Sequence, residues 1–103
     1  MREIRWQGTS FEDLKVMPKA VQRNAGYQLH LIQFGLEPSD WKPMKAIGTG
    51  VREIRIHHNG QYRIIYVSIK KEAIYILHSF QKKTQKTSKK DLNLAKARLK
   101  EIK

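Results

Sequence analysis

Hydrophobic positions along the chain follow two different periodicities. From about Pro18 to Phe34, apolar residues recur three or four positions apart, which predicts an amphipathic helix. From Val51 onward the pattern changes to short runs of β-branched and aromatic residues separated by turn signals. These runs, at residues 51–56, 61–69 and 73–80, are typical of three antiparallel strands connected as a meander. Asn59-Gly60 supplies the first hairpin turn.

Two helices are predicted before the meander. Ser10 followed by Asp13 resembles a capping box and predicts the start of a short first helix, with Phe11 and Leu14 as its buried pair. In the longer second helix, Gly26 costs roughly 1 kcal/mol relative to alanine, so we expect it to permit a close approach of a neighbouring element. The buried stripe of the second helix is predicted to be Val21, Ala25, Leu29 and Ile32, with Leu36 continuing it past the end.

The remaining segments complete an α+β domain. Residues 2–6 alternate charged and apolar side chains and permit an additional N-terminal strand, whereas residues 39–50 are expected to form a loop. Ser88 followed by Asp91 predicts the start of a terminal helix. Its apolar stripe, which either covers the domain or receives a partner, is Leu92, Ala95, Leu99 and Ile102. We therefore predict one domain over residues 1–103, with an N-terminal helical hairpin packed on a small antiparallel sheet and a C-terminal helix.

The charge of the chain indicates what kind of partner it binds. Its 21 Lys and Arg residues against nine Asp and Glu residues leave a formal net charge of +12, which attracts phosphate backbones. An anionic membrane surface or an acidic protein is the alternative partner, but a membrane surface would require an amphipathic helix with bulky apolar residues opposite lysines, so nucleic acid is favoured. No apolar run resembles a signal peptide or a membrane span, so a cytoplasmic protein is expected. With no cysteine and no zinc-like spacing among the four histidines, we expect no metal or cofactor.

Alternation along the predicted strands places ionisable groups on a shared face. Glu53, Arg55 and His57 lie opposite the two isoleucines of the first strand, so we expect them on its more solvated side, where Arg63 of the second strand can join them. At the end of the third strand, His78 and Phe80 share a face. The lysines that follow are Lys82, Lys83, Lys86, Lys89 and Lys90. Such a surface can hold an RNA phosphate between cations while aromatic rings stack on bases.

Each of these groups also has an ordinary structural interpretation. Arg55 and Arg63 can pair with Glu53 or Glu72 at the surface. The histidines before the first turn can be solvated, and His78, which lies in an apolar run, can be a hydrogen-bonded and semi-buried side chain. The lysines can form a solvated charge run, although five neighbouring cations repel one another.

Three stretches of the sequence resemble the RelE/ParE superfamily of bacterial toxins, and most closely its HigB-like, phage-derived subgroup. They are residues 50–56, residues 62–66, and residues 78–87 with their Phe-x-Lys-Lys-Thr-x-Lys-Thr motif. The resemblance spans residues 10–102 and implies a RelE-like fold. It also implies a type II toxin that cuts mRNA on the ribosome without a metal, through the substrate's own 2′-hydroxyl. A HigA-like antitoxin, the ribosome and mRNA are the implied partners, with no membrane.

The resemblance implies a role for each candidate residue. Arg55 and Arg63 stabilise transition-state charge, while Lys82 and Lys83 position the phosphate, with Lys83 counted as catalytic. Candidates for proton transfer are Glu53, His57, Tyr62 and His78. Candidates for RNA binding are Lys82, Lys86, Lys89, Lys90, Arg52, Tyr62 and Phe80.

Two departures from RelE keep other functions open. Glu53 stands where RelE proper has a lysine, and residues 88–103 have no counterpart of its catalytic tyrosine. The first alternative is a ParE-like toxin that inhibits DNA gyrase without cutting RNA. The second is a module that binds nucleic acid without chemistry.

Overall fold

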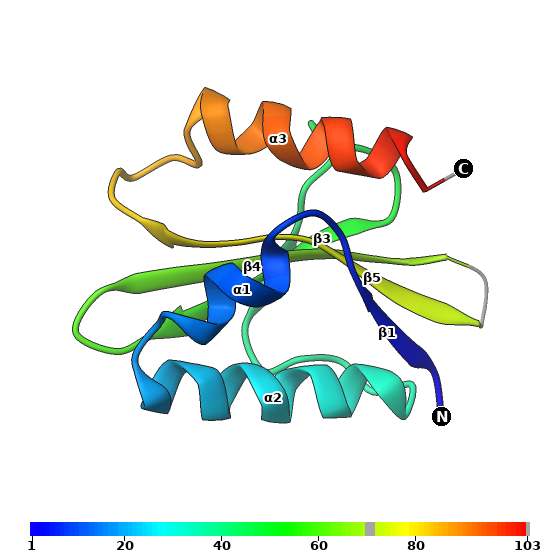
Figure 1. Cartoon of the computed structure of the whole chain (residues 1–103), viewed down its shortest axis with the longest axis horizontal. Helices are drawn as coiled ribbons and strands as arrows, with labels where there is room; N and C mark the ends of the chain where they lie inside the picture. The colour runs from blue at the N-terminus through cyan, green and yellow to red at the C-terminus, as the bar shows by residue number, and fades with distance from the viewer. Residues whose placement is uncertain (70–71, 103) are drawn as a thin grey trace.

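The computed structural model describes residues 1–69 and 72–102 as three layers, with the sheet between α3 on one side and α1 and α2 on the other (Figure 1). The strands are β1 (Glu3–Trp6), β2 (Trp41–Pro43), β3 (Val51–His57), β4 (Gln61–Ile69) and β5 (Ala73–Lys82). The helices are α1 (Ser10–Lys15), α2 (Lys19–Gln33) and α3 (Lys89–Lys100). The predicted α+β class, with its helical hairpin, meander and C-terminal helix, is confirmed.

The sheet has the strand order β1-β5-β4-β3-β2. The antiparallel meander β3-β4-β5 is confirmed, and the additional N-terminal strand that the sequence permitted forms as β1, which pairs in parallel with β5 rather than antiparallel. After α1 and α2 the chain re-enters the sheet as β2 at the edge farthest from β1, and the meander then brings β5 back beside β1. β2 lies inside the predicted loop and pairs with β3. Its three residues are too few for alternation to reveal, and its Pro43 fits an edge strand.

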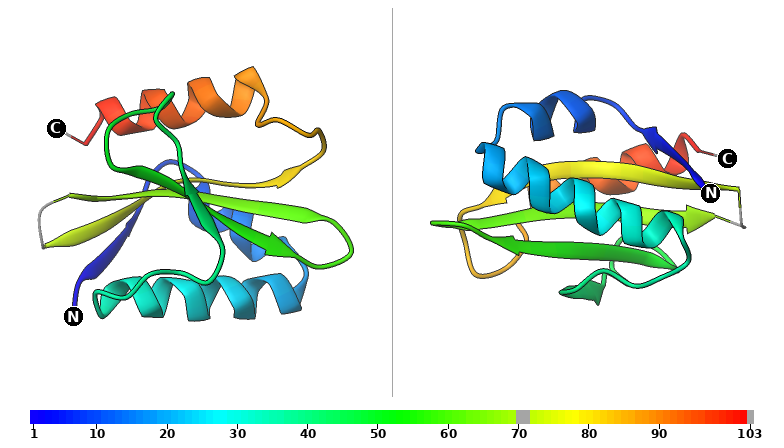
Figure 2. Two further views of the ribbon diagram at one scale, coloured as in Figure 1. Left: turned by 180° about the vertical axis from the view of Figure 1, so that it is seen from behind. Right: turned by 90° about the horizontal axis from the view of Figure 1, so that it is seen from below.

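Both faces of the sheet are covered, and each carries its own hydrophobic cluster (Figures 1 and 2). On the α2 side, the predicted helix stripe is buried against Ile54, Ile56, Ile64, Tyr66, Ile74 and Ile76. On the α3 side, the sheet contributes Val51, Ile65, Val67, Leu77 and Phe80. The predicted α3 stripe contacts this second cluster, so α3 covers the domain. Two-sided burial explains the long apolar runs within β4 and β5.

Several predictions for the helices need correction. Leu36 and Phe11 are exposed, by 59% and 42%, because the chain turns away after α2 and Phe11 lies edge-on against the partly buried Trp6. A side chain added at Gly26 would meet nothing within 4 Å, so no element approaches it closely. Ser10 is not a cap, because its hydroxyl donates to the carbonyl of Ile76 in the core.

The cap of α3 is confirmed. The backbone N–H of Asp91 donates to Ser88 Oγ at 3.1 Å, and the Ser88 hydroxyl donates to Asp91 Oδ2 at 2.7 Å. Arg98 lies outside the predicted apolar stripe, yet it is buried. Its guanidinium donates to the carbonyl of Leu77 at 2.9 Å and to Thr9 Oγ1 at 3.1 Å, which ties α3 to β5 and to the start of α1.

Candidate nucleic-acid interface

Basic side chains from neighbouring strands meet on the α3 side of the sheet. Residues paired across a ladder point to the same face, and Arg55 of β3 lies opposite Arg63 of β4, which lies opposite Phe80 of β5. The adjoining row toward the hairpin is His57, Gln61 and Lys82. The row behind it is Lys42, Glu53, Ile65 and His78. We call Lys42, Arg55, Arg63, Lys82 and Lys83 the cationic cluster.

The cationic cluster borders a pocket of about 450 Å³. The pocket is lined by Gln61, Arg63, Lys82, Lys83, Thr84 and Gln85. It lies where the β3-β4 turn and the segment between β5 and α3 come to the same end of the molecule (Figures 1 and 2). Lys86, Lys89 and Lys90 are exposed on that segment and on the first turn of α3. The pocket therefore joins β4 and β5 to residues 83–88, which we call the lysine-rich segment.

A β-bulge in β5 determines which face the end of this strand presents. The ladder pairs Ile76 with Tyr66 and His78 with Ile65. Leu77 is thus an additional residue, and the alternation of β5 shifts by one from this point. Without the bulge, His78 and Lys82 would share the α2 side with Ile76. The bulge brings them to the side of Arg55 and Arg63.

Glu53 lies beneath the cationic cluster and is fully buried, at 0% exposure. The prediction that it faces solvent is wrong, because α3 and the segment before it cover this side of the sheet. Its Oε1 is 3.4 Å from Arg63 Nε and 4.0 Å from Lys42 Nζ, and its Oε2 accepts a hydrogen bond from Thr87 Oγ1 at 3.0 Å. One carboxylate therefore connects β3 to β2, to β4 and to the lysine-rich segment.

The cations of the cluster influence one another electrostatically. Burial lowers the pKa of the Arg63 guanidinium, while Glu53 raises it and Arg55 lowers it further. Burial also lowers the pKa of Lys82, and Glu53 again acts in the opposite direction. The positive charges of Arg63, Lys42 and Arg55 lower the pKa of Lys82 further. Such crowding of like charges is relieved when an anion binds between them.

Arg55 has a carboxylate partner that the sequence analysis did not consider. Asp40 Oδ1 accepts hydrogen bonds from Arg55 Nε at 2.9 Å and from Nη2 at 2.7 Å. Asp40 Oδ2 lies 3.4 Å from Nε2 of the exposed His57. The bond from Arg55 holds the pKa of the Asp40 carboxyl below its usual value. Asp40, rather than Glu53 or Glu72, is therefore the ion-pair partner of Arg55.

Replacing Asp40 by asparagine is expected to change stability in a pH-dependent way. Because the folded-state pKa of Asp40 is depressed, its contribution is present above the unfolded pKa of about 3.9 and is lost as pH falls through the folded value. Both side chains are more than a third exposed, so near neutral pH the Asp40→Asn variant should lose less than about 1 kcal/mol. Urea unfolding at several pH values measures this. A deficit that persists at about pH 2 would contradict the assignment.

His78 is buried beside the cluster and hydrogen-bonded, as one interpretation of the sequence proposed. Its Nε2 lies 2.7 Å from Asp91 Oδ1, and its ring stacks on Phe80 with centroids 4.5 Å apart. Phe80 is only 8% exposed, so its ring is not open for a base to stack on. Among the described residues, His78 Nδ1 has no hydrogen-bond partner. The contact between His78 and Asp91 joins β5 to the first turn of α3.

Two candidates for RNA binding lie away from the cationic cluster. Tyr62 points to the opposite face and belongs to the core on the α2 side. Arg52 also points to that face, where its guanidinium lies 4.0 Å from the centre of the Trp41 ring and 3.5 Å from Glu37. Their strand positions place them there, because Tyr62 is one position from Arg63 and Arg52 is three positions from Arg55, and side chains an odd number of positions apart on a strand point to opposite faces.

The family described as Phage derived protein Gp49-like (DUF891) matches residues 12–100. The chain belongs to this family. The Gp49-like family is associated with toxins of the RelE/HigB type. Its match begins within α1 and ends at the last residue of α3, so it includes the whole cationic cluster.

A search of curated proteins finds no match to this Gp49-like chain. Within residues 1–69 and 72–102, no helix combines the length and the apolar character needed to cross a bilayer.

Proposed function

We propose that the chain is the HigB-like toxin of a type II toxin–antitoxin module and that it cuts mRNA on the ribosome. The observation that carries the proposal is the meeting of Arg55, Arg63 and Lys82 on one face, beside an open pocket. Membership of the Gp49-like family supports the toxin assignment. Guanidinium and ammonium groups held by a sheet are preorganised for the charge of a reacting phosphate.

The proposed reaction is cleavage by the substrate's own 2′-hydroxyl. This oxygen attacks the adjacent phosphorus while the bond from phosphorus to O5′ breaks, which leaves a 2′,3′-cyclic phosphate and a 5′-hydroxyl. A base accepts the proton of the 2′-hydroxyl, and an acid supplies one to O5′. Arg63 and Lys82, which both line the pocket, stabilise the additional negative charge of the transition state. Lys83 and the exposed lysines that follow hold the neighbouring phosphates.

The geometry narrows the candidates for proton transfer. Glu53 is enclosed by its own partners, so we assign it to positioning Arg63 and the lysine-rich segment. His78 is buried behind Phe80, and Tyr62 faces the other side of the sheet. His57 is exposed and lies on the cluster's own face, in the row of Lys82. We therefore assign one proton transfer to His57.

Replacing His57 by alanine is expected to lower the rate of cleavage by about 10²-fold, the lower end of the usual range for a general acid or base. The measurement is cleavage of a programmed mRNA on purified ribosomes, with the pH profile recorded for each variant. His58→Ala is the matched control, because the adjacent His58 is also exposed but lies in the turn after β3. Equal losses in the two variants would remove His57 from the mechanism.

The test of the proposed function is to map new mRNA ends after brief expression of the chain in bacteria. Cuts are expected within translated messages and not within matched messages that lack a start codon. New ends in both classes would contradict dependence on the ribosome. Gyrase-linked DNA breaks without any new mRNA ends would overturn the proposal in favour of a ParE-like toxin.

A further inference from the structure

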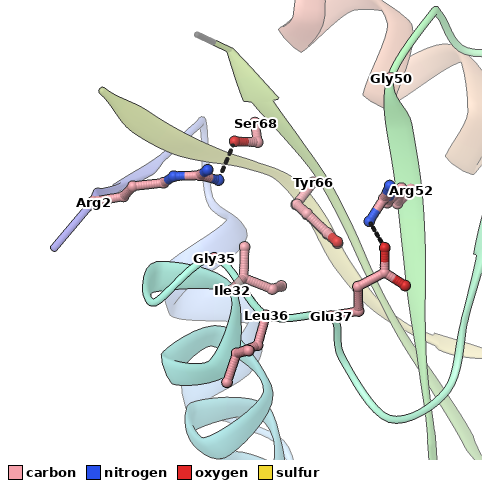
Figure 3. Close-up of a pocket in the computed structure, with 9 residues that line it drawn as sticks. All are labelled: Arg2, Ile32, Gly35, Leu36, Glu37, Gly50, Arg52, Tyr66 and Ser68. Carbon is pink, nitrogen blue, oxygen red and sulfur yellow. Dashed lines mark hydrogen bonds and ion pairs between the residues drawn. The ribbon is translucent and has the colours of Figure 1, made fainter. Parts of the chain in front are cut away.

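A second basic pocket lies on the other face of the sheet, at the opposite end of β3 and β4 from the cationic cluster (Figure 3). Its volume is about 330 Å³. Arg2, Arg52, Tyr66 and Ser68 supply its polar lining, and the chain after α2 forms its rim with Leu36 and Glu37. The N-terminal segment before β1, strands β3 and β4, and the end of α2 therefore all contribute to it.

Two guanidinium groups flank this pocket, one from Arg2, just before β1, and one from Arg52 in β3 (Figure 3). Arg2 Nη1 donates to the neutral Ser68 Oγ at 2.8 Å, and within residues 1–69 and 72–102 no carboxylate forms an ion pair with Arg2. Arg52 Nη1 lies 3.5 Å from Oε2 of Glu37, a side chain that is 62% exposed. A pair this exposed is weak and exchanges readily with another carboxylate. Glu37 thus marks the kind of group that the pocket accepts.

The fold leaves an apolar side chain of the pocket rim, Leu36, in water, together with two others on α2 and at its C-terminal end that do not line the pocket. Leu36 is 59% exposed, and Phe34, at the end of α2, is 60% exposed. Tyr27, two helical turns earlier, is 57% exposed. Exposed apolar residues beside a polar pocket are typical of a surface that binds another protein.

We propose that this pocket docks an acidic, amphipathic segment of the antitoxin. One carboxylate of the segment enters between Arg2 and Arg52, and its apolar side chains cover Leu36 and Phe34. This rests on the proposed function for the identity of the partner. Charge complementarity favours this occupant, because a second copy of the chain also carries +12 and is repelled. The bulky apolar rim suits protein side chains rather than a phosphate backbone.

The experiment measures binding of the product of the neighbouring open reading frame to the full chain by calorimetry. The Arg2→Gln/Leu36→Lys variant is expected to bind at least about tenfold more weakly, as for residues at the centre of an interface. Its mRNA cleavage without the partner should be unchanged. The Arg23→Gln/Val16→Lys variant is the control, because both residues are exposed and neither lines this pocket. Unchanged affinity in the first variant would overturn the proposal, as would equal losses in both.

A second measurement keeps the test decisive if the variant fails to fold. Amide NMR shifts of the unmodified chain, recorded with and without the partner, should change at residues 34–37 and 66–68. Changes confined to the cationic cluster, or no binding at all, would overturn the proposal. A short RNA that competes with the partner for residues 34–37, or a dimer of the chain that Leu36→Lys dissociates, would do so too. If the unmodified chain binds the partner but does not cut mRNA, only the proposed function is contradicted.

Discussion

Replacing Arg63 by alanine is expected to lower mRNA cleavage by about 10³- to 10⁵-fold, the range for arginines that stabilise a transferring phosphoryl group. Arg63 lies in the middle strand of the meander, opposite Arg55, and lines the pocket together with Lys82. Its side chain is held in place by burial and by Glu53, so its charge needs no reorganisation when substrate arrives. Ribosome-dependent cleavage, measured in single turnovers, reports this loss directly.

Arg63→Ala also leaves Glu53 without its nearest cation, so stability must be measured in parallel. Arg63→Lys retains the positive charge but not the planar fork, and it should fold while still losing most of the activity. Arg23→Lys is the matched control, since Arg23 is exposed on α2 and should change neither property. Near-normal cleavage by a folded Arg63→Ala variant would show that the cationic cluster does not contact the scissile phosphate.

Replacing Glu53 by alanine is expected to lower the free energy of unfolding by about 3–5 kcal/mol, the usual effect of removing one partner of a buried ion pair. The variant leaves the Arg63 guanidinium, which is 7% exposed, without a counter-charge. It also removes the hydrogen bond from Thr87, which ties the lysine-rich segment to β3. Chemical denaturation measures the loss, and hydrogen exchange of residues 83–88 should rise.

Two further variants separate the charge of Glu53 from its hydrogen bond. Glu53→Gln keeps an oxygen that can accept from Thr87, so it should lose less stability than the alanine variant. In the Glu53→Ala/Arg63→Ala double variant the loss should be smaller than the sum of the single losses, because no charge remains buried alone. Glu101→Ala, at an exposed position after α3, is the control. Additive losses would mean that Glu53 and Arg63 do not interact.

The contacts of Glu53 explain why a glutamate stands where RelE proper has a lysine. A lysine at this position would face Arg63 and Lys42 with no anion between them, so the carboxylate suits these neighbours. The glutamate therefore does not argue for a loss of catalysis. The RelE tyrosine has no counterpart in residues 88–103, where the apolar stripe of α3 packs on the sheet instead.

Most of the elements could be predicted from local patterns. The stripe of α2, the meander and the Ser88 cap each follow from residues that are close together in the sequence. A prediction that depended on the side chain of a single residue, the cap at Ser10, was wrong. Ser10 had the right chemistry for a cap, but its hydroxyl bonds across to β5. Tertiary contact overrides such local preferences because a buried hydroxyl needs a partner wherever one is available.

By itself, the sequence determined the helices, the meander and the shared face of Glu53, Arg55, His57 and Arg63, since these follow from periodicity and short-range turn signals. Only the tertiary structure decided that Glu53 is buried, that Asp40 reaches Arg55, and that Lys82 joins the cluster. The bulge at Leu77 leaves no mark in the hydrophobic pattern of β5, because both faces of this strand are covered and its residues are apolar on either side of the shift. A shift of one residue there reverses every later side chain, which is why the convergence of the cations could not be read from alternation alone.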